Sequence, residues 1–276
     1  MRRKLFTLLT LTVFTLSSWA EDGHRLWLPA QKSQTAHVST NAQSATIDLA
    51  KQELTDYFAG TKATLLIDPA LTDDEGFTIN GNEDSVVVRA RRDIGLLYGA
   101  YDVLRRQATQ GNMNHVEQHP RFRLRMLNHW DNLDGSIERG YAGESIFEWF
   151  HLDEALLHQY ARANASIGIN GSVLNNVNAS PKMLTREYLD EVRKIADLLR
   201  PYGIRVYLSI NFATPMALGD TRTADPKNKR VRQWWKRKAK EIYSIIPDFG
   251  GFLVKANSEG QPGPGDYHRT HAEGAN

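Results

Sequence analysis

Three polar side chains near the C-terminal end of the sequence follow an apolar run, at a spacing that could serve one ligand. Residues 252–254 are apolar and suit a buried strand, and Lys255, Asn257 and Glu259 come next at alternate positions. Side chains of a strand alternate between its two faces, so these three would share a face in an extended chain. Four extended residues span about 13 Å, which is too far for Lys255 and Glu259 to contact one small ligand. The chain is therefore expected to curl after Asn257.

Residues that stop strands and shape turns follow at once: Gly260, Pro262, Gly263 and Pro264. A curled chain would project Glu259 as an acid catalyst, with Lys255 and Asn257 as neighbouring cationic and hydrogen-bonding groups. An ammonium close to a carboxyl favours its ionised form, so Lys255 is expected to face an anion of the ligand rather than Glu259. A solvated loop glutamate is the alternative interpretation.

A second polar run, residues 128–132, surrounds an aromatic ring with hydrogen-bonding side chains. Trp130 in this setting suits a sugar, which offers an apolar ring face to stack on and hydroxyls to bind. Trp130 could instead be a rim residue that seals the end of the fold. Asp131 could act as a second carboxylate, but it could equally cap a helix or pair with Arg139.

Two other groups of charged residues favour no special site. Residues 227–240 contain eight basic side chains, but the apolar residues between them keep helical spacing, which indicates the solvated face of a helix. Asp266, His268, His271 and Glu273 lie in a loop-like tail without a helical frame to hold a metal ion. We therefore predict neither a metal site nor a cofactor.

Residues 21–120 are predicted to form a small α/β domain that packs against the rest of the chain. Helices and strands are expected at about 47–58, 63–67, 76–79, 85–88 and 93–106. This segment offers no evident nucleophile, metal cluster or phosphate loop. The polar run 107–120 ends at Pro120, where we place the domain boundary.

Residues 121–276 alternate strands with helices, which predicts a parallel sheet. Strands are expected near 122–128, 171–174, 204–210 and 252–256, with helices near 152–163, 185–199 and 231–246. Each strand ends in a polar run, which favours the first four units of a (β/α)₈ TIM barrel over a doubly wound sheet. A full barrel needs about 250 residues, so we expect a truncated half-barrel with open strand edges.

The first 20 residues read as a secretory signal peptide. Arg2, Arg3 and Lys4 precede an apolar stretch, and cleavage is expected after Ala20. Without the signal the chain has 31 basic and 32 acidic residues. This balance predicts neither a nucleic-acid partner nor a membrane association after cleavage. No cysteine is present, so no disulfide or thiolate metal site can form. We expect an exported protein of bacterial style, periplasmic or secreted.

Two long motifs resemble one enzyme family. Residues 125–143 and 254–264 closely resemble the α-glucuronidases of glycoside hydrolase family 67. Residues 21–120 also look like the N-terminal α/β domain of that family, so the resemblance covers nearly the whole chain after the signal peptide. It implies an inverting exo-glycosidase of xylan degradation. The substrates implied are oligosaccharides derived from glucuronoxylan, from which it cleaves α-1,2-linked (4-O-methyl)-D-glucuronic acid.

The same resemblance implies roles for individual residues. Glu259 would be the general acid, and Lys255 would bind the uronate carboxylate. Trp130 would help form the glucuronate pocket, and Val177 would face the 4-O-methyl side of the sugar. Asn257 and Asp131 are further candidates for binding the substrate.

The resemblance also implies what a longer chain would supply. In the family, the base carboxylates come from later barrel strands, and a C-terminal helical domain forms a homodimer. We therefore expect no turnover by these 276 residues alone.

The residues themselves are also compatible with two other functions. Another exo-glycosidase, such as a β-hexosaminidase, would commonly present adjacent Asp and Glu residues, whereas Ser258 precedes Glu259 here. A non-catalytic carbohydrate-binding protein is the second alternative. Selective binding of an acidic sugar would separate these alternatives from an α-glucuronidase.

Overall fold

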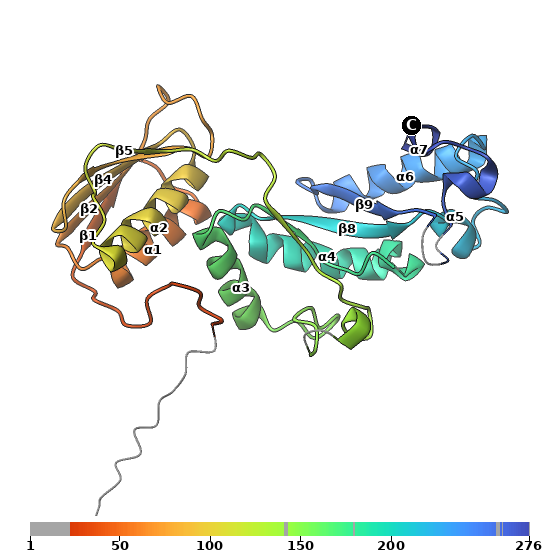
Figure 1. Cartoon of the computed structure of the whole chain (residues 1–276), viewed down its shortest axis with the longest axis horizontal. Coiled ribbons are helices and arrows are strands. Elements are labelled where there is room, and N and C mark those ends of the chain that lie inside the picture. The colour runs from red at the N-terminus through yellow and green to blue at the C-terminus, as the bar shows by residue number, and fades with distance from the viewer. Residues whose placement is uncertain (1–22, 141–142, 179, 258–259, 261, 276) are drawn as a thin grey trace, which may run out of the picture.

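The chain forms two α/β units that lie side by side in Figure 1. The computed structural model describes residues 23–140, 143–178, 180–257, 260 and 262–275. The predicted signal peptide and Glu259 lie outside the described residues. Each unit has its own sheet, and the mixed α/β class predicted from the sequence is confirmed.

The first unit is a five-stranded sheet in the order β1-β2-β4-β3-β5, with two helices on one face (Figure 1). Strands β1, β2 and β4 are parallel, while β3 is antiparallel to both β4 and β5. The elements are β1 (His37–Thr40), α1 (Ala45–Tyr57), β2 (Lys62–Ile67), β3 (Phe77–Gly81), β4 (Ser85–Ala90), α2 (Asp93–Thr109) and β5 (Val116–Gln118).

Local sequence explains most of this unit. The Ser44 side chain caps α1 by accepting a hydrogen bond from the Ile47 N–H, and Ala50 and Leu54 continue the buried stripe. Both predicted helices and the three predicted strands are confirmed within a few residues. The short strands β1 and β5 were not predicted, because each has only three or four residues with little apolar alternation.

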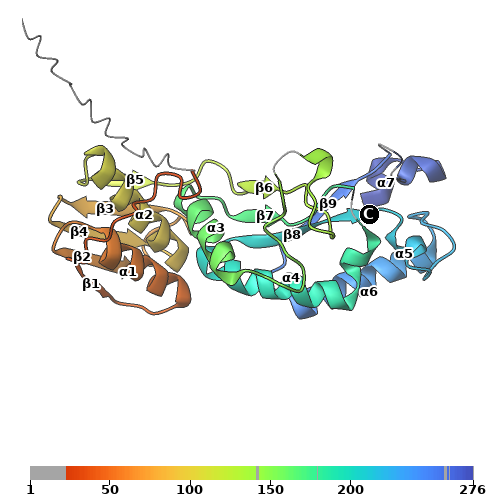
Figure 2. The same cartoon turned by 90° about the horizontal axis from the view of Figure 1, so that it is seen from below.

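The second unit is a four-stranded parallel sheet in the order β6-β7-β8-β9. Helices α3, α4 and α6 lie along one face of this sheet in Figure 2. The main elements are β6 (Met126–Asn128), α3 (Glu154–Ser166), β7 (Gly171–Val173), α4 (Arg186–Leu199), β8 (Arg205–Asn211), α6 (Lys229–Ile245) and β9 (Gly251–Lys255). Shorter helical segments are η1 (Glu138–Gly140), η2 (Pro181–Leu184), η3 (Arg200–Tyr202), α5 (Thr214–Ala217), η4 (Pro264–Tyr267) and α7 (His271–Ala275).

The alternation of strands and helices predicted for residues 121–276 is therefore confirmed, including the parallel order. One prediction was wrong in extent, because the first strand was expected over residues 122–128 and β6 contains only three residues. Phe122 and Leu124 are 72% and 62% exposed instead of packing in the sheet. Closure into a barrel stays a prediction, since the sheet of the described residues is open at β6 and β9.

A continuous apolar core joins the two units. Leu54 and Leu97 in the first unit belong to the same buried cluster as Leu157 and Leu189 in the second. Gly203, at the turn between η3 and β8, lies where the units meet. Its φ of +73° suits glycine, and a Cβ there would lie 2.3 Å from Cδ1 of Ile94. The first unit therefore packs tightly against the second.

A buried ion pair crosses the same junction. The Arg162 guanidinium on α3 donates hydrogen bonds of 2.5 Å and 2.8 Å to the two carboxylate oxygens of Glu53 on α1. The Glu53 side chain is only 8% exposed, and the Arg162 guanidinium also lies 4.7 Å from the Tyr57 ring centroid. Burial alone would lower the pKa of Arg162, but the bonds to Glu53 and its charge raise that pKa instead.

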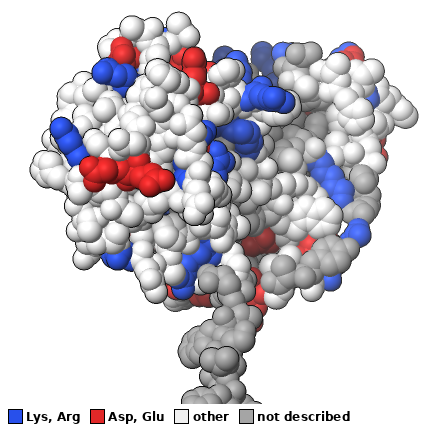
Figure 3. Space-filling view, turned by 60° about the vertical axis from the view of Figure 1, so that its left-hand side comes forward, with Lys and Arg blue, Asp and Glu red and all other residues white. Residues whose placement is uncertain are grey.

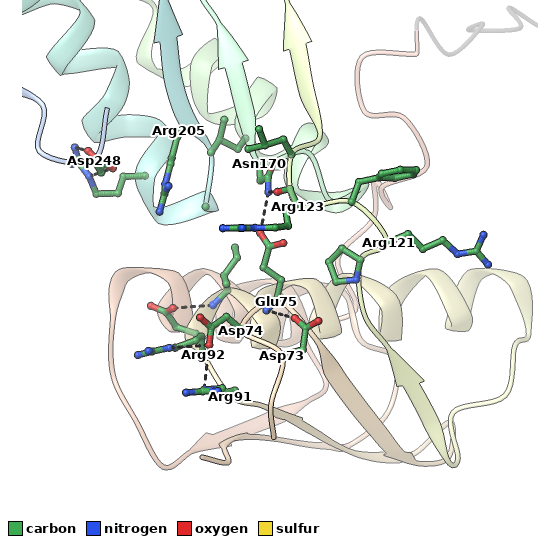
Figure 4. A pocket seen from close by; sticks show the side chains of 18 of the residues that line it. Asp73, Asp74, Glu75, Arg91, Arg92, Arg121, Arg123, Asn170, Arg205 and Asp248 are labelled. Carbon is green, nitrogen blue, oxygen red and sulfur yellow. Dashed lines mark hydrogen bonds and ion pairs between the residues drawn. The ribbon is translucent and has the colours of Figure 1, made fainter. Parts of the chain in front are cut away.

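A cleft of about 1080 Å³ opens between the units at the amino ends of the strands. Figure 4 shows the Asp73–Glu75 loop of the first unit facing Asn170, Arg123 and Arg205 of the second. Glu75 accepts hydrogen bonds from Asn170 Nδ2 at 3.1 Å and from an Arg125 guanidinium nitrogen at 3.0 Å. These bonds add polar contacts to the apolar junction.

The surface shows no continuous patch of one charge on the face displayed in Figure 3, where basic and acidic side chains are interspersed. This distribution agrees with the nearly equal numbers of acidic and basic residues in the sequence. Among the described helices, none is both long enough and apolar enough to cross a membrane.

Four largely buried tyrosines are expected to make the folded chain sensitive to alkali. Burial raises the pKa of Tyr98, Tyr160 and Tyr202 from 10.0 to about 12, and it raises the pKa of Tyr101 well above 10.0. Folding thus favours the neutral phenols, so their contribution to stability is complete below pH 10.0 and is lost as the pH rises through about 12. We expect the free energy of unfolding in urea to fall above pH 10.0.

Tyrosinate absorbance would report the same event, because these four of the ten tyrosines should ionise only as the chain unfolds. Titration of all ten phenols in a folded chain, with one ordinary pKa, would contradict the prediction.

Candidate functional site

The polar loops predicted to carry the chemistry meet at the carboxyl edge of the parallel sheet. Asn128 of β6 pairs in register with Val173 of β7, and Asn211 of β8 pairs with Lys255 of β9. Parallel strands place their carboxyl ends along the same edge, so the segments that follow them are neighbours. The side chain of Asn175 fixes the loop after β7 to β8, through hydrogen bonds with the Ser209 backbone.

Lys255 lies half-buried at the end of β9 and reaches across to the loop after β7. Its Nζ donates a hydrogen bond of 2.7 Å to Oδ1 of Asn178. A fixed lysine ammonium beside a cavity is a suitable partner for a ligand carboxylate. The structure therefore brings together two loops whose residues lie 77 positions apart in the sequence.

Trp130 is half-buried in the loop after β6. The Arg139 guanidinium lies 5.9 Å from the centroid of its indole ring, which is a cation–π contact. Arg139 has a φ of +59°, a left-handed backbone conformation that is uncommon for a residue with a side chain. The backbone oxygen of Trp130 also accepts a hydrogen bond of 2.9 Å from the N–H of Glu138. The ring is thus held by the segment that follows it.

Asp131 is buried, with 4% of its surface exposed. Its carboxylate accepts a hydrogen bond of 2.5 Å from Ser145 Oγ and lies 3.5 Å from Nδ1 of His129. His129 Nε2 in turn lies 2.8 Å from the Tyr160 hydroxyl. These partners differ from the helix N–H and the Arg139 guanidinium considered from the sequence. A carboxylate held in this way positions the Trp130 loop.

A cavity of about 450 Å³ lies between the loops after β6 and β7. It is lined by Asp131, Asn132, Leu133, Asp134, Asn175, Asn176, Asn178, Ser180, Lys182 and Tyr188. Of the site residues predicted from the sequence, Asp131 is in this lining, and Lys255 reaches it through Asn178. Trp130 and Val177 are adjacent in sequence to lining residues without being among them.

Asn257 organises the loop that follows β9. Its φ is +54°, a left-handed backbone conformation. The curl predicted after Asn257 falls on residues 258 and 259, which lie outside the described residues. The Nδ2 group donates a hydrogen bond of 3.1 Å to Asp266, and Oδ1 accepts one of 3.1 Å from the N–H of Gly265. The Asn257 amide is therefore bonded within its own loop, and its predicted contact with substrate stays a prediction. The predicted acid, Glu259, lies outside the described residues.

No cluster of three or more His, Asp or Glu side chains that could hold a metal ion occurs in the described part of the chain. Asp266 bonds to Asn257 and to the Gly263 N–H, while Glu273 pairs with Lys227. These contacts give the carboxylates of the C-terminal segment a structural role.

Residues 104–276 match the sequence pattern of the Glycosyl hydrolase family 67 middle domain. The chain belongs to glycoside hydrolase family 67. The resemblance found in its two motifs is thereby confirmed, and the chain is assigned to a family of glycoside hydrolases.

Two relatives show how much of a family 67 protein this chain represents. It is 48% identical over 209 residues to probable alpha-glucuronidase A of Aspergillus fumigatus, covering 74% of this chain and 25% of that protein. It is 38% identical over 318 aligned positions to probable alpha-glucuronidase A of Aspergillus clavatus, covering 99% of this chain and 38% of that protein. The family 67 chain thus spans a quarter to two fifths of the length of these relatives.

A solved structure supports the fold. A GH138 enzyme targeting pectin rhamnogalacturonan II superposes on 79% of this chain and 30% of its own, with a TM-score of 0.54 and 16% sequence identity. At this identity the similarity concerns the fold alone. The arrangement of this family 67 chain therefore also occurs in another glycoside hydrolase.

Sequence reasoning missed two residues of the family 67 site. Residues 175–178 are one of the polar runs that follow the predicted strands, but Asn176 and Asn178 were not predicted to have a role. Asn178 holds Lys255, and the buried Asn176 bonds to Asn132 in the loop after β6 and to the Asn178 N–H in its own loop. Three asparagines among the four residues after the predicted strand 171–174 were the available signal, although the sequence does not show which partners they bind.

Proposed function

We propose that this chain is part of an inverting α-glucuronidase that releases (4-O-methyl)-D-glucuronic acid, α-1,2-linked, from xylo-oligosaccharides of xylan. The observation that carries the proposal is the Lys255 ammonium, held by Asn178 beside the cavity in a family 67 chain. The activity concerns the whole protein, of which the chain is a part.

Recognition of the uronate carboxylate is the role proposed for Lys255. An ammonium held in place forms a strong, charge-assisted hydrogen bond to a carboxylate, and part of the entropy cost of ordering its long side chain has already been met. Trp130 stacks on the sugar ring, supported from one side by Arg139. Val177, between Asn176 and Asn178, faces the 4-O-methyl group, and Asp131 and Asn257 complete the polar surroundings.

Glu259 is the proposed general acid. It follows Asn257 by two residues, in the loop that the Asn257 amide connects to residues 265 and 266. In an inverting mechanism the acid protonates the leaving oxygen, and a base carboxylate about 6.5–9.5 Å away activates a water molecule on the other side of the ring.

The proposal extends to the architecture and setting of the whole protein. The four parallel strands would be the first half of a (β/α)₈ barrel, whose carboxyl edge carries the active site in that fold. Residues 1–20 would direct export to the periplasm or the exterior, and the full-length protein would form a homodimer.

Binding measurements test the proposal on the chain itself. We expect calorimetric titration to show tighter binding of glucuronic acid than of xylose. Lys255→Ala should weaken glucuronic acid binding by roughly tenfold or more, because a hydrogen bond to a charged group contributes about 1.5–3 kcal/mol. Xylose binding should not change, since xylose carries no carboxylate.

Lys194→Ala is the matched control. Lys194 lies on α4 and pairs with Glu191, away from the carboxyl edge of the sheet, so its loss should leave both sugars unaffected. Equal binding of the two sugars by the unmodified chain would favour a non-catalytic carbohydrate-binding protein instead.

A further inference from the structure

We infer that Asn176 is a positioning residue that fixes Lys255 relative to the Trp130 loop and thereby sets selectivity for a carboxylated sugar. The inference rests on the proposed function. Asn176 lies between Lys255 and Trp130, the two residues proposed to contact the ligand. Its buried side-chain amide makes the hydrogen bonds that support this role.

Both hydrogens of the Asn176 amide are donated to the segment that contains Trp130. Nδ2 donates a bond of 2.9 Å to Oδ1 of Asn132 and a bond of 2.5 Å to a carboxylate oxygen of Glu138. Asn176 is only 2% exposed, so water cannot readily replace these bonds. A carboxylate accepts hydrogen bonds, so the Asn176 amide points its nitrogen toward Glu138.

The oxygen side of Asn176 bonds to the residue that holds Lys255. Its Oδ1 accepts a hydrogen bond of 2.9 Å from the Asn178 N–H, and its own backbone N–H donates one of 2.8 Å to the Asp131 oxygen. Asn178 then accepts the bond from Lys255 through its side-chain oxygen. One amide thus connects the loop after β6 with the ammonium on β9.

The orientation of Asn178 is also determined. An ammonium can only donate, so Asn178 must present Oδ1 to Lys255, and its Nδ2 group points elsewhere. That Nδ2 makes no hydrogen bond to any residue that the structure describes, and Asn178 lines the cavity. It is placed to donate to a carboxylate oxygen that Lys255 binds.

Asn176 also holds the segment, residues 138 and 139, that supports the Trp130 ring. Glu138, which accepts from Asn176, donates its N–H to the Trp130 oxygen and precedes Arg139, whose guanidinium lies over the ring. Without the Asn176 amide, neither the Arg139 guanidinium nor the Trp130 ring would be held in its position. A positional error of this kind lowers affinity for a ligand that must contact both groups.

The test compares binding of glucuronic acid and xylose by the chain and by its variants. We expect Asn176→Ala to lower the ratio of the two affinities about tenfold, since Asn178, which accepts from Lys255, is then no longer fixed to the Trp130 loop. Asn176→Asp should have a similar effect, because it keeps the acceptor for Asn178 but loses both donated bonds and places a second carboxylate beside Glu138. Xylose binding should fall less in either variant, because xylose has no carboxylate and loses only the contact with the Trp130 ring.

Asn170→Ala is the matched control. Asn170 lies before β7, at its opposite end, and its amide also makes three hydrogen bonds, with Arg125, Glu75 and Arg123. Its loss should lower Tm while leaving the ratio of affinities unchanged. A purely structural role for Asn176 predicts this same result for the Asn176 variants, and that result would overturn the inference.

If the Asn176 variants do not fold, Asn178→Leu provides a second test of the positioning role. Asn178 is partly exposed, and the substitution removes both its bond to Lys255 and the Nδ2 donor that it presents to the cavity, so the ratio should fall by about tenfold or more. An unchanged ratio would overturn the inference while leaving the proposed function standing. Lack of discrimination by the unmodified chain would refute the proposed function, and the inference with it.

Discussion

Glu259→Ala, introduced into the whole protein, should lower kcat on aldotetraouronic acid by about 10²–10⁴-fold, the range typical of a general acid. The leaving group of that substrate is a sugar hydroxyl, which must be protonated as it departs. The same variant should retain most of its activity on an aryl glucuronide with a good leaving group, because that group departs with little protonation. Steady-state kinetics on the two substrates measures the difference.

A matched control is Glu273→Ala. Glu273 is a glutamate of the same segment whose carboxylate pairs with Lys227 and bonds to Thr270. Its loss should not change how activity depends on the leaving group. If Glu259→Ala lowered activity equally on both substrates, Glu259 would act in some way other than as an acid.

Glu53→Ala should lower the free energy of unfolding by about 3–5 kcal/mol, the range measured when one partner of a buried ion pair is removed. The variant leaves the Arg162 guanidinium at the junction of the two units without the carboxylate that accepts two of its hydrogen bonds. Arg162 stays charged in the variant, because a guanidinium is not deprotonated in proteins. Urea unfolding at neutral pH measures the loss.

The double replacement Glu53→Met with Arg162→Met tests the reason for that loss. Removing both charges should restore much of the stability, because apolar side chains of similar size often substitute for a buried pair. Asp190→Ala breaks an exposed pair with Arg186 on α4 and should change stability little. If the double variant were as unstable as Glu53→Ala, the loss of stability would come from packing and not from the unpaired charge.

The Glu53–Arg162 pair also illustrates what sequence patterns omit. Apolar spacing predicted α1 and α3, but Glu53 and Arg162 lie 109 positions apart and nothing in either helix pattern marks them as partners. Periodicity reports which face of an element is buried, and it carries no information about the element that covers this face.

The candidate site divides in the same way. The position of Lys255 at a strand end followed from local residue types and was confirmed. The hydrogen-bond partners of Asp131 and Asn257 could not be predicted from local residue types. In the structure both side chains make hydrogen bonds that organise their own loops. Short polar side chains have many acceptable partners, so only the meeting of loops selects among them.

By itself the sequence determined the α/β class, the parallel order of the second sheet and, through two long motifs, membership of glycoside hydrolase family 67. These features depend on local periodicity or on unbroken runs of residues. Only the tertiary structure decided that Asn176 connects the Trp130 loop to Asn178 and Lys255, and that Glu53 and Arg162 join the units. The reason is physical: a hydrogen bond forms between groups that folding brings within about 3 Å, and distance along the chain does not determine that proximity.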